Sequence, residues 1–283
     1  MTPPKAEPEK QALRVSVVVV SHNRAAQLRR CLESLERSEA REQLQLIVVD
    51  NGSTDGAADL KLADEFPNVQ FIRLPKNFGL TKALNLGWRA ADAPYVFFLH
   101  DDTEAEPATA ARLADVLDEH VDAAAACPLL VDEEGRPAPQ LGSLPPDGRW
   151  RPVEVASDDP APVSYPRGAA LMARVFSIKA MRQIDERYGQ FGSDADLAQQ
   201  IRRASKKILL SPAVRVIHRP AAEHTAHERA DFLLGQAEFL GKYQGFMAGL
   251  RARIASVLGP LVGLRFGELR YTIAGQKIDG TQM

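Results

Sequence analysis

The chain has little of several features that mark common classes of protein. Only two cysteines occur in its 283 residues, Cys31 and Cys127, and each lies in an apolar stretch. So few cysteines argue against a disulfide framework or a cysteine-based zinc site, and they fit a reducing compartment such as the cytoplasm. The apolar runs at residues 15–20 and 254–266 are both too short to cross a bilayer.

Glycine-rich phosphate-binding motifs are also missing. No GxGxxG follows the first apolar run, where Ser21-His22-Asn23-Arg24 stands, and GxxxxGK[ST] occurs nowhere. The sequence therefore argues against a dinucleotide-binding or P-loop protein. With a formal net charge of −2, nothing suggests a broad nucleic-acid-binding surface, so no nucleic-acid partner is expected.

The first half of the chain alternates strand-like and helix-like segments. Leu28, Cys31, Leu32 and Leu35 recur at helical spacing. This alternation predicts an α/β fold with a mostly parallel central sheet flanked by helices. The strands are expected at residues 14–20, 44–49, 69–74 and 95–99, and a second helix at residues 81–91.

The second half changes character. Residues 132–166 hold 8 of the 19 prolines, which indicates a functional loop or a linker. A helix is expected after Ser193, and the spacing of Ser193 and Asp196 predicts a capping box at its start. Strand-like stretches follow at residues 207–210 and 213–217.

Polar residues follow each apolar run of the first half. In an open parallel sheet, ligands bind outside the carboxyl ends of the strands, so these four turns should line one crevice. Two adjacent carboxylates, Asp101 and Asp102, would repel each other unless a cation or a basic partner neutralised them. Carboxylate oxygens suit Mg²⁺ or Mn²⁺, with substrate phosphates completing the coordination shell. The other turns, such as Asn51-Gly52, also occur as ordinary structural turns.

The four turns, in this order, resemble glycosyltransferase family 2, and in particular its rhamnosyltransferase-like bacterial members. The matching segments are VSVVVVSHNR, LIVVDNGSTDG, LPKNFGLTKALNLG and FFLHDDT, followed by IDERYGQFGSDADLAQQIRRA and VRVIHRP. The resemblance implies the GT-A fold and an inverting transfer of a sugar from a UDP- or dTDP-sugar to a hydroxyl of a glycan or lipid-linked acceptor. It also implies a role in cell-envelope polysaccharide biosynthesis.

The resemblance assigns a role to each residue that matches the family pattern. A divalent cation, Mn²⁺ or Mg²⁺, would be bound by Asp102 and His218, and Asp194 would be the general base that takes the acceptor's proton. The nucleotide-binding residues would be Ser21, Asn23, Arg24, Asp50, Asn77, Gly79 and Asp101.

Two positions depart from the family pattern. His100 stands where relatives often have an acidic residue or asparagine, and Ser193 stands where many have glutamate. An alternative interpretation is therefore a catalytically decayed protein that binds nucleotide sugars or acts as a scaffold. Three aromatic residues, Trp150, Tyr165 and Tyr188, either stack on a sugar ring or pack in the core.

Composition and the resemblance, which covers roughly residues 14–220, together divide the chain. Residues 1–13 form an expected disordered lead-in, and residues 14–227 a GT-A catalytic domain with a nucleotide-binding half (14–128) and an acceptor-binding half (129–227). Residues 228–283 form a helical C-terminal extension with seven Lys/Arg and five Asp/Glu. Two alternatives stay open for this extension. It either rests on the inner face of a membrane that carries the acceptor, as a peripheral contact, or mediates a homodimer.

Overall fold

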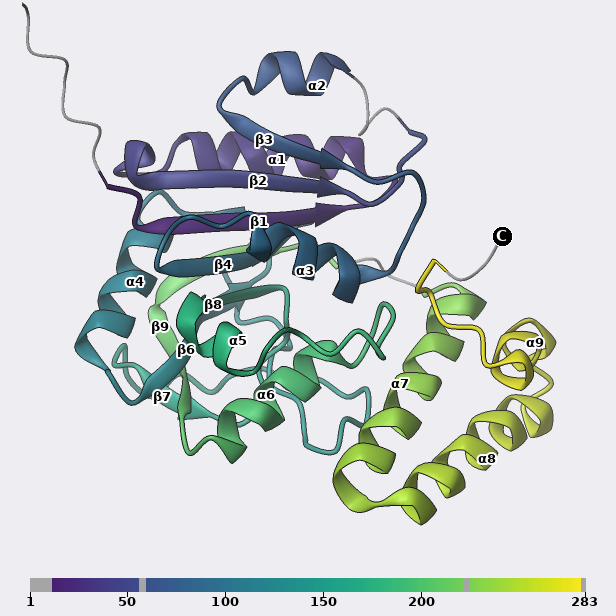
Figure 1. Cartoon of the computed structure of the whole chain (residues 1–283). Helices are drawn as coiled ribbons and strands as arrows, with labels where there is room; N and C mark the ends of the chain where they lie inside the picture. The colour runs from purple at the N-terminus through teal and green to yellow at the C-terminus, as the bar shows by residue number, and fades with distance from the viewer. Residues whose placement is uncertain (1–11, 56–59, 221–223, 281–283) are drawn as a thin grey trace, which may run out of the picture.

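The protein folds around one mixed β-sheet with helices on both of its faces (Figure 1). The computed structural model describes residues 12–55, 60–220 and 224–280, so the expected lead-in over residues 1–13 lies almost wholly outside the described residues. The strand order is β3-β2-β1-β4-β8-β6-β9-β5, and β7 pairs with β9. The strands are β1 (Val15–Ser21), β2 (Leu44–Asp50), β3 (Val69–Arg73), β4 (Tyr95–His100), β5 (Thr103–Ala105), β6 (Ala123–Val131), β7 (Ala161–Val163), β8 (Ala170–Arg174) and β9 (Lys207–His218).

The two faces of the sheet carry separate hydrophobic cores. Val17 and Val19 of β1 belong to the core that includes α1 and α4, whereas Val18 belongs to the core that includes α3 and α6. The burial of β1 on both faces explains its near-continuous valine run. The helices are α1 (Ala25–Glu36), α2 (Leu60–Glu65), α3 (Leu80–Arg89), α4 (Thr109–Glu119), α5 (Val175–Ala180), α6 (Ser193–Arg203), α7 (Ala226–Gln244), α8 (Phe246–Val262) and α9 (Phe266–Ala274), with a 3₁₀ turn at Arg41–Gln43.

The α/β prediction is confirmed, and the first four predicted strands end within a residue of the observed ones. Strands β3, β2, β1 and β4 are parallel throughout. Beyond β4 the sheet becomes mixed, because β8 runs antiparallel to both β4 and β6, while β9 runs parallel to β6. The change of direction matters for function, since it brings chain segments from the second half to the carboxyl ends of the parallel strands.

The pairing register shows which residues meet at this edge. Ser21 pairs with Asp50, and Val20 with His100, so β1, β2 and β4 end side by side. The His100 N–H donates to the carbonyl of Ala169 at 2.9 Å, which sets the residues before β8 beside the end of β4. On the far side of the turn after β4, Thr103 pairs with His218.

Two expectations for the second half need correction. The stretches predicted at 207–210 and 213–217 form one strand, β9. The capping box predicted at Ser193 and Asp196 is wrong, because Gly192 is the N-cap and no side chain caps α6. Asp196 is instead fully buried. A capping box does begin α7, where Thr225 and Glu228 cap each other.

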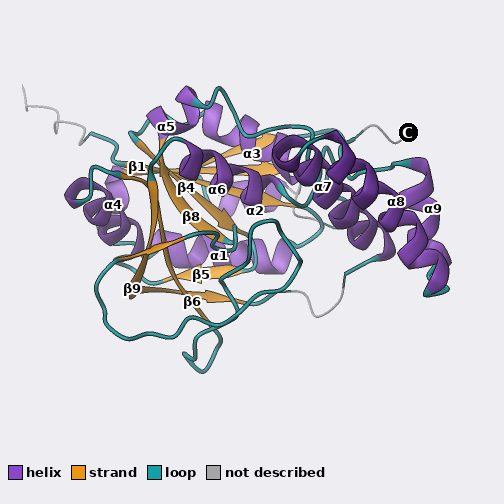
Figure 2. Cartoon of the chain, turned by 90° about the horizontal axis from the view of Figure 1, so that it is seen from below, coloured by secondary structure: helices purple, strands orange, loops and turns teal. Residues whose placement is uncertain are grey.

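The helical C-terminal extension is present as α7, α8 and α9, which pack together at one side of the sheet (Figures 1 and 2). Helices α7 and α8 come close at Gly241 and Gly249, where a Cβ on Gly249 would strike the backbone of α7. After α9 the chain turns back to α7, where the Ile278 N–H donates to the Asp231 carboxylate at 2.8 Å. No helix among the described residues is long and apolar enough to cross a membrane.

Candidate active site

The two adjacent carboxylates after β4 are both nearly buried, and a basic residue from the end of β1 lies against them. Arg24 donates to Asp102 at 2.8 Å and lies 3.6 Å from Asp101. The Ser21 hydroxyl donates to Asp101 at 2.8 Å. The arginine therefore offsets part of the repulsion that the sequence predicted for this pair.

The two carboxylates differ in their affinity for a proton. Burial raises the pKa of Asp101 to about 7, although Arg24 acts in the opposite direction. Burial also acts to raise the pKa of Asp102, but the neighbouring His218 and His100 outweigh it and hold that pKa below its usual range. Asp102 therefore binds a proton less tightly than Asp101 and is ionised at neutral pH.

A third residue joins the two predicted metal ligands. His100, Asp102 and His218 each offer a ligand atom, and these atoms lie within 4.8 Å of one another. The Nε2 of His218 is 3.5 Å, and the Nδ1 of His100 3.9 Å, from Asp102 Oδ1. Burial lowers the pKa of His100 to about 4, so its imidazole is neutral at neutral pH and keeps a lone pair for a metal.

Two buried atoms of this cluster lack a hydrogen-bond partner among the described residues. They are Oδ1 of Asp102 and Nδ1 of His218. Buried polar atoms are almost always paired, so unpaired ones call for an explanation such as an ion. The cluster therefore fits a divalent cation, and it includes His100, which the sequence marked only as a departure from the family pattern.

The predicted nucleotide-binding residues lie in turns that are linked to each other. Asn23 has a positive φ of 54°, its N–H donates to Ser53 Oγ at 2.9 Å, and its side-chain oxygen accepts the Thr54 N–H at 2.7 Å. Asp50 accepts the Ser53 N–H at 3.0 Å. These bonds fix the turns after β1 and β2 against each other.

The turn before α3 is held by the side chains of Asn77 and Asn51, whose oxygen atoms already accept hydrogen bonds. The side-chain oxygen of Asn77 accepts from Asn51 at 2.9 Å and from the Gly79 N–H at 2.8 Å. Asn51 was not predicted as a site residue, yet it also accepts the Phe78 N–H at 2.9 Å. Gly79 has a φ of 80°, and a Cβ there would overlap the carbonyl oxygen of Ile278. Gly79 thus permits the close approach of the C-terminal segment.

The predicted general base lies in the first turn of α6. Asp194 is half-buried, and its Oδ1 accepts the Ala195 N–H at 2.8 Å. Burial raises its pKa, an effect that is partly offset by hydrogen bonds from Tyr165 and from the backbone of Gly168. A Cβ on Gly168 would come within 3.0 Å of the Cβ of Asp194. The carboxylate is therefore enclosed by the segment that precedes β8.

Arg167 is a candidate site residue that sequence reasoning missed. Its charge interacts with those of Asp102 and Asp194, and burial lowers its pKa. The guanidinium lies over the ring of Trp150, 5.5 Å from its centroid, but no carboxylate within the described ranges lies close enough to form an ion pair with it. Only the antiparallel pairing of β8 with β4 brings Arg167 to this edge, so no local pattern could have indicated it.

The structure places the three aromatic candidates in different environments. Tyr188 is buried in the core, where its hydroxyl donates to Asp196 at 3.2 Å. Tyr165 is buried beside Asp194, with its ring centroid 5.0 Å from that of Trp150. Trp150 remains partly exposed, whereas the other two are buried.

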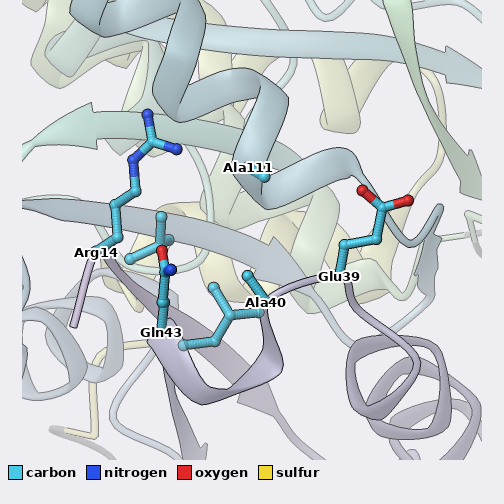
Figure 3. Close-up of a pocket in the computed structure, with 7 residues that line it drawn as sticks. Arg14, Glu39, Ala40, Gln43 and Ala111 are labelled. Atoms are coloured by element: carbon cyan, nitrogen blue, oxygen red, sulfur yellow. The ribbon is translucent and has the colours of Figure 1, made fainter. Parts of the chain in front are cut away.

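A small pocket elsewhere does not compete with this site. It lies at the opposite, amino ends of β1 and β2 (Figure 3), and the guanidinium of Arg14 there is already paired with Asp115 and Asp118. The other charged residue of the lining, Glu39, is exposed. Its residues are Arg14, Val15, Glu39, Ala40, Gln43, Leu44 and Ala111.

A mixed sheet of this order, with an acidic turn after β4, defines a GT-A fold, and solved structures of that class match the chain. GalNAc-T7, solved with UDP, GalNAc and Mn²⁺, matches 94% of this chain with a TM-score of 0.71 at 15% identity, and the match spans 57% of GalNAc-T7. S. aureus TarS (residues 1–349), solved with UDP-GlcNAc, matches 81% of this chain and 67% of its own length, with a TM-score of 0.57 at 16% identity.

Sequence comparison then shows the family. The model described as Glycosyl transferase family 2 matches residues 16–174, more than half of the chain, so the chain belongs to this family of glycosyltransferases. An N-acetylglucosaminyl-diphospho-decaprenol L-rhamnosyltransferase of Mycobacterium tuberculosis is 25% identical over 254 residues, which cover 77% of this chain and 82% of the relative. An N-acetylglucosaminyltransferase of Mesorhizobium japonicum is 33% identical over 116 residues, which cover 40% of this chain and 27% of that relative.

Proposed function

We propose that this chain moves a sugar from a UDP- or dTDP-sugar donor to a hydroxyl of a glycan or a lipid-linked saccharide, with inversion. The observation that carries the proposal is the meeting at one sheet edge of a candidate metal cluster, the half-buried carboxylate of Asp194 and the unpaired charge of Arg167. Support comes from the M. tuberculosis relative, whose name specifies a diphospho-decaprenol-linked sugar and rhamnosyl transfer. We further propose that it acts in the cytoplasm, in cell-envelope polysaccharide synthesis, and its two buried, unpaired cysteines fit this compartment.

The residues present fit a divalent cation held by His100, Asp102 and His218. When bound, such a cation stabilises the negative charge that develops on the diphosphate as the bond to the sugar breaks. Magnesium takes oxygen ligands almost exclusively, whereas imidazole nitrogens suit transition-metal ions. Of the two ions expected from the sequence, we therefore propose Mn²⁺, the ion present in the GalNAc-T7 structure.

Asp194 is proposed to accept the proton of the attacking acceptor hydroxyl. Its raised pKa gives the carboxylate a higher proton affinity than that of an exposed aspartate, which favours proton transfer in the transition state. The hydrogen bonds from Ala195 and Tyr165 hold the carboxylate in position. Attack from the face opposite the leaving diphosphate, in one displacement, produces inversion.

Arg167 is proposed to bind the donor diphosphate. A half-buried guanidinium without an ion pair has an unmet demand for an anion, and a preorganised cation at a site of developing charge stabilises the transition state. The ring of Trp150 holds the guanidinium in position, and this stacking leaves the N–H groups at the guanidinium edge available for phosphate oxygens.

The nucleoside is proposed to lie along the turns after β1 and β2. Ser21, Arg24 and Asp101 form one linked group at the edge of this region. We propose that Asn23 and Asp50 contact the base or ribose. Asn77 and Gly79 are proposed to shape the same region indirectly, because the side-chain oxygen of Asn77 already accepts hydrogen bonds from Asn51 and Gly79.

A transfer assay tests the proposal as a whole. The protein is incubated with a panel of UDP- and dTDP-sugars and a saccharide acceptor that has free hydroxyl groups, with and without Mn²⁺. Release of the nucleoside diphosphate is measured, and the anomer of the glycoside formed on the acceptor is determined by NMR. We expect Mn²⁺-dependent release for one or a few donors. In the Asp194→Asn variant, release should fall by roughly 10²–10⁴-fold while nucleotide binding is retained.

Asp158→Asn is the matched control, because it removes an exposed carboxylate in the proline-rich segment. Binding is measured by thermal shift, since a ligand at a hundred times its dissociation constant stabilises the fold by about 2.7 kcal/mol. Nucleotide binding without release from any donor would support the decayed-protein alternative. A retained sugar configuration would refute the one-step displacement by Asp194.

A further inference from the structure

The outer surface of the C-terminal helices is unusually apolar. Among the described residues, ten of the fourteen exposed large hydrophobic side chains lie between residues 246 and 273. Phe246 and Val262, at the two ends of α8, are 77% and 83% exposed. Exposed apolar surface concentrated on one element marks an interaction site rather than ordinary surface.

Helical spacing places these side chains along one side of α8. Met247, Leu250, Ile254, Leu258 and Leu261 follow at intervals of three or four residues, and all five are exposed. The other side of α8 packs against α7 through Gly249 and against α9, with Ser256 and Pro260 buried. The side of α8 that carries the apolar row is therefore left without a neighbour among the described residues.

The charges around this surface are of one sign. From residue 239 to residue 267 the sequence has no acidic residue, but it has Arg251, Arg253 and Arg265, besides Lys242, whose ammonium is paired with Asp185 and Asp196. Arg251 is exposed and has no ion pair within the described part of the chain, and neither has Arg270 of α9, whose guanidinium lies over Tyr271. The nearby Glu268 is buried and already paired with Arg229 and Arg265.

The apolar row and the unpaired arginines together favour one kind of partner, an anionic bilayer. Apolar side chains next to unpaired arginines match the interface of a bilayer that contains anionic phospholipids, where the chains enter the acyl boundary and the guanidinium groups meet phosphates. A symmetric dimer through the same surface fits less well. Its two-fold axis would bring Arg251 near the second copy's cationic residues, and α8 offers no acidic residue to pair with them.

The placement of this surface also fits the reaction. In Figure 1, the arrowheads of β1 and β2 point toward the side of the molecule on which α8 and α9 lie, and the candidate active site is at the carboxyl ends of these strands. After α9 the chain returns to that edge, where Ile278 lies on Gly79 and the Lys82 ammonium donates to the Asp279 carbonyl at 3.0 Å. The apolar surface and the site are thus joined by a short, anchored segment.

We propose that the α8–α9 surface docks on an anionic phospholipid bilayer and that this holds the active-site edge where a membrane-anchored acceptor can reach it. The second part of this inference rests on the proposed function, because it requires a lipid-linked acceptor. The first part, bilayer binding, is independent of it. The two parts can therefore fail separately.

Vesicle flotation of the full chain tests the docking. The probes are phosphatidylcholine vesicles with and without 30% phosphatidylglycerol, a proportion of about one lipid in three chosen for a strong negative surface potential. The double variant Ile254→Glu/Leu258→Glu should bind the anionic vesicles at least tenfold more weakly than the unmodified chain. Arg251→Gln and Arg270→Gln should each weaken binding about fivefold, the factor expected for one arginine at such a surface.

Val121→Glu and Phe176→Glu are matched controls, because both side chains are large, apolar and exposed (77% and 63%) but lie outside the C-terminal helices. Both controls should float as the unmodified chain does. Equal binding by the α8 double variant and the controls would overturn the docking proposal, as would a dimer by light scattering that only the double variant dissociates.

Release of nucleoside diphosphate from a soluble donor, in the absence of vesicles, separates the two proposals. The α8 variants should retain it, because their substituted side chains are exposed and distant in sequence from the site residues. Retained release with lost flotation supports docking. Flotation by a chain that releases no nucleoside diphosphate would leave docking supported and overturn the proposed function.

Discussion

Replacing Lys242 by methionine tests how α6 is held in place. Asp196 is fully buried on α6, and its Oδ1 accepts from the Lys242 ammonium at 2.7 Å and from the Tyr243 hydroxyl at 2.8 Å. Its Oδ2 accepts from Gln200 at 2.6 Å. Methionine keeps most of the lysine stem but removes the charge, so the substitution leaves a buried carboxylate with only neutral donors.

The magnitude follows from what remains around the carboxylate. Removing one partner of a buried ion pair typically costs 3–5 kcal/mol, because the other charge stays buried without compensation. The neutral donors Tyr188, Tyr243 and Gln200 are retained, so we expect the lower end of that range, about 3 kcal/mol. Lys242 also bonds to Asp185, but that carboxylate keeps Arg187 and adds little to the loss. For a chain of this size the melting temperature should fall by roughly 6–12 °C.

Urea unfolding at neutral pH measures this loss directly. The midpoint should fall with an unchanged m value, which shows that stability and not the exposed surface has changed. Lys207→Met is the matched control, since it breaks an exposed ion pair with Asp122 and should leave the midpoint nearly unchanged. If both lysine variants unfold at the same urea concentration, the Asp196 carboxylate is solvated in solution and the reasoning fails. Asp196→Asn combined with Lys242→Met should cost less than the sum of the single changes.

Three further predictions concern the reaction. Tyr165→Phe removes a hydrogen bond that lowers the pKa of Asp194. Because the base must be ionised, the acidic limb of the kcat/KM profile should move to higher pH. A full pH profile whose acidic limb stays in place or moves to lower pH would show that Tyr165 does not lower the pKa of the base. His100→Ala removes a nitrogen from the candidate metal cluster and should weaken Mn²⁺ affinity by at least tenfold, measured by titration calorimetry, whereas unchanged affinity would remove His100 from the ligand set. Arg167→Gln should lower kcat/KM by about 10²–10³-fold while the fold stays intact by circular dichroism, and a loss of less than threefold would mean that the guanidinium does not contact the diphosphate.

The parallel half of the fold could be predicted because its signals are local. A run of valines buried on both faces reads as a central strand, and a polar turn after such a strand must lie at the carboxyl end of the sheet. The same reasoning predicts from the sequence that Ser21, Asp50 and Asp102 lie at one edge of the sheet, as they do in the structure. The parallel strand register then places the polar turns side by side, because parallel strands of similar length end together.

The remaining parts of the site depend on contacts between distant segments. Arg167 reaches the edge only through the antiparallel pairing of β8, and His218 only through the pairing of β9 with β5. Asp196 was interpreted as a capping residue because its spacing from Ser193 fits a capping box. Its real partners, Lys242 and Tyr243, lie about 46 residues away on α7. Local spacing carries no information about such pairs.

The buried cluster around Asp196 also connects the two proposals. Asp194, the proposed base, precedes Asp196 by two residues on α6, and Asp196 bonds to Lys242 in the last turn of α7. Only Gly245 separates α7 from Phe246, the first residue of α8, and the apolar row of α8 begins at the next residue, Met247. A chain docked through α8 would therefore hold α7, which packs on the opposite side of α8, in a fixed orientation to the bilayer. The ion pair would carry that orientation to the helix that positions the base. This arrangement accounts for a lysine–aspartate pair in a place where two apolar side chains would pack at no cost in desolvation.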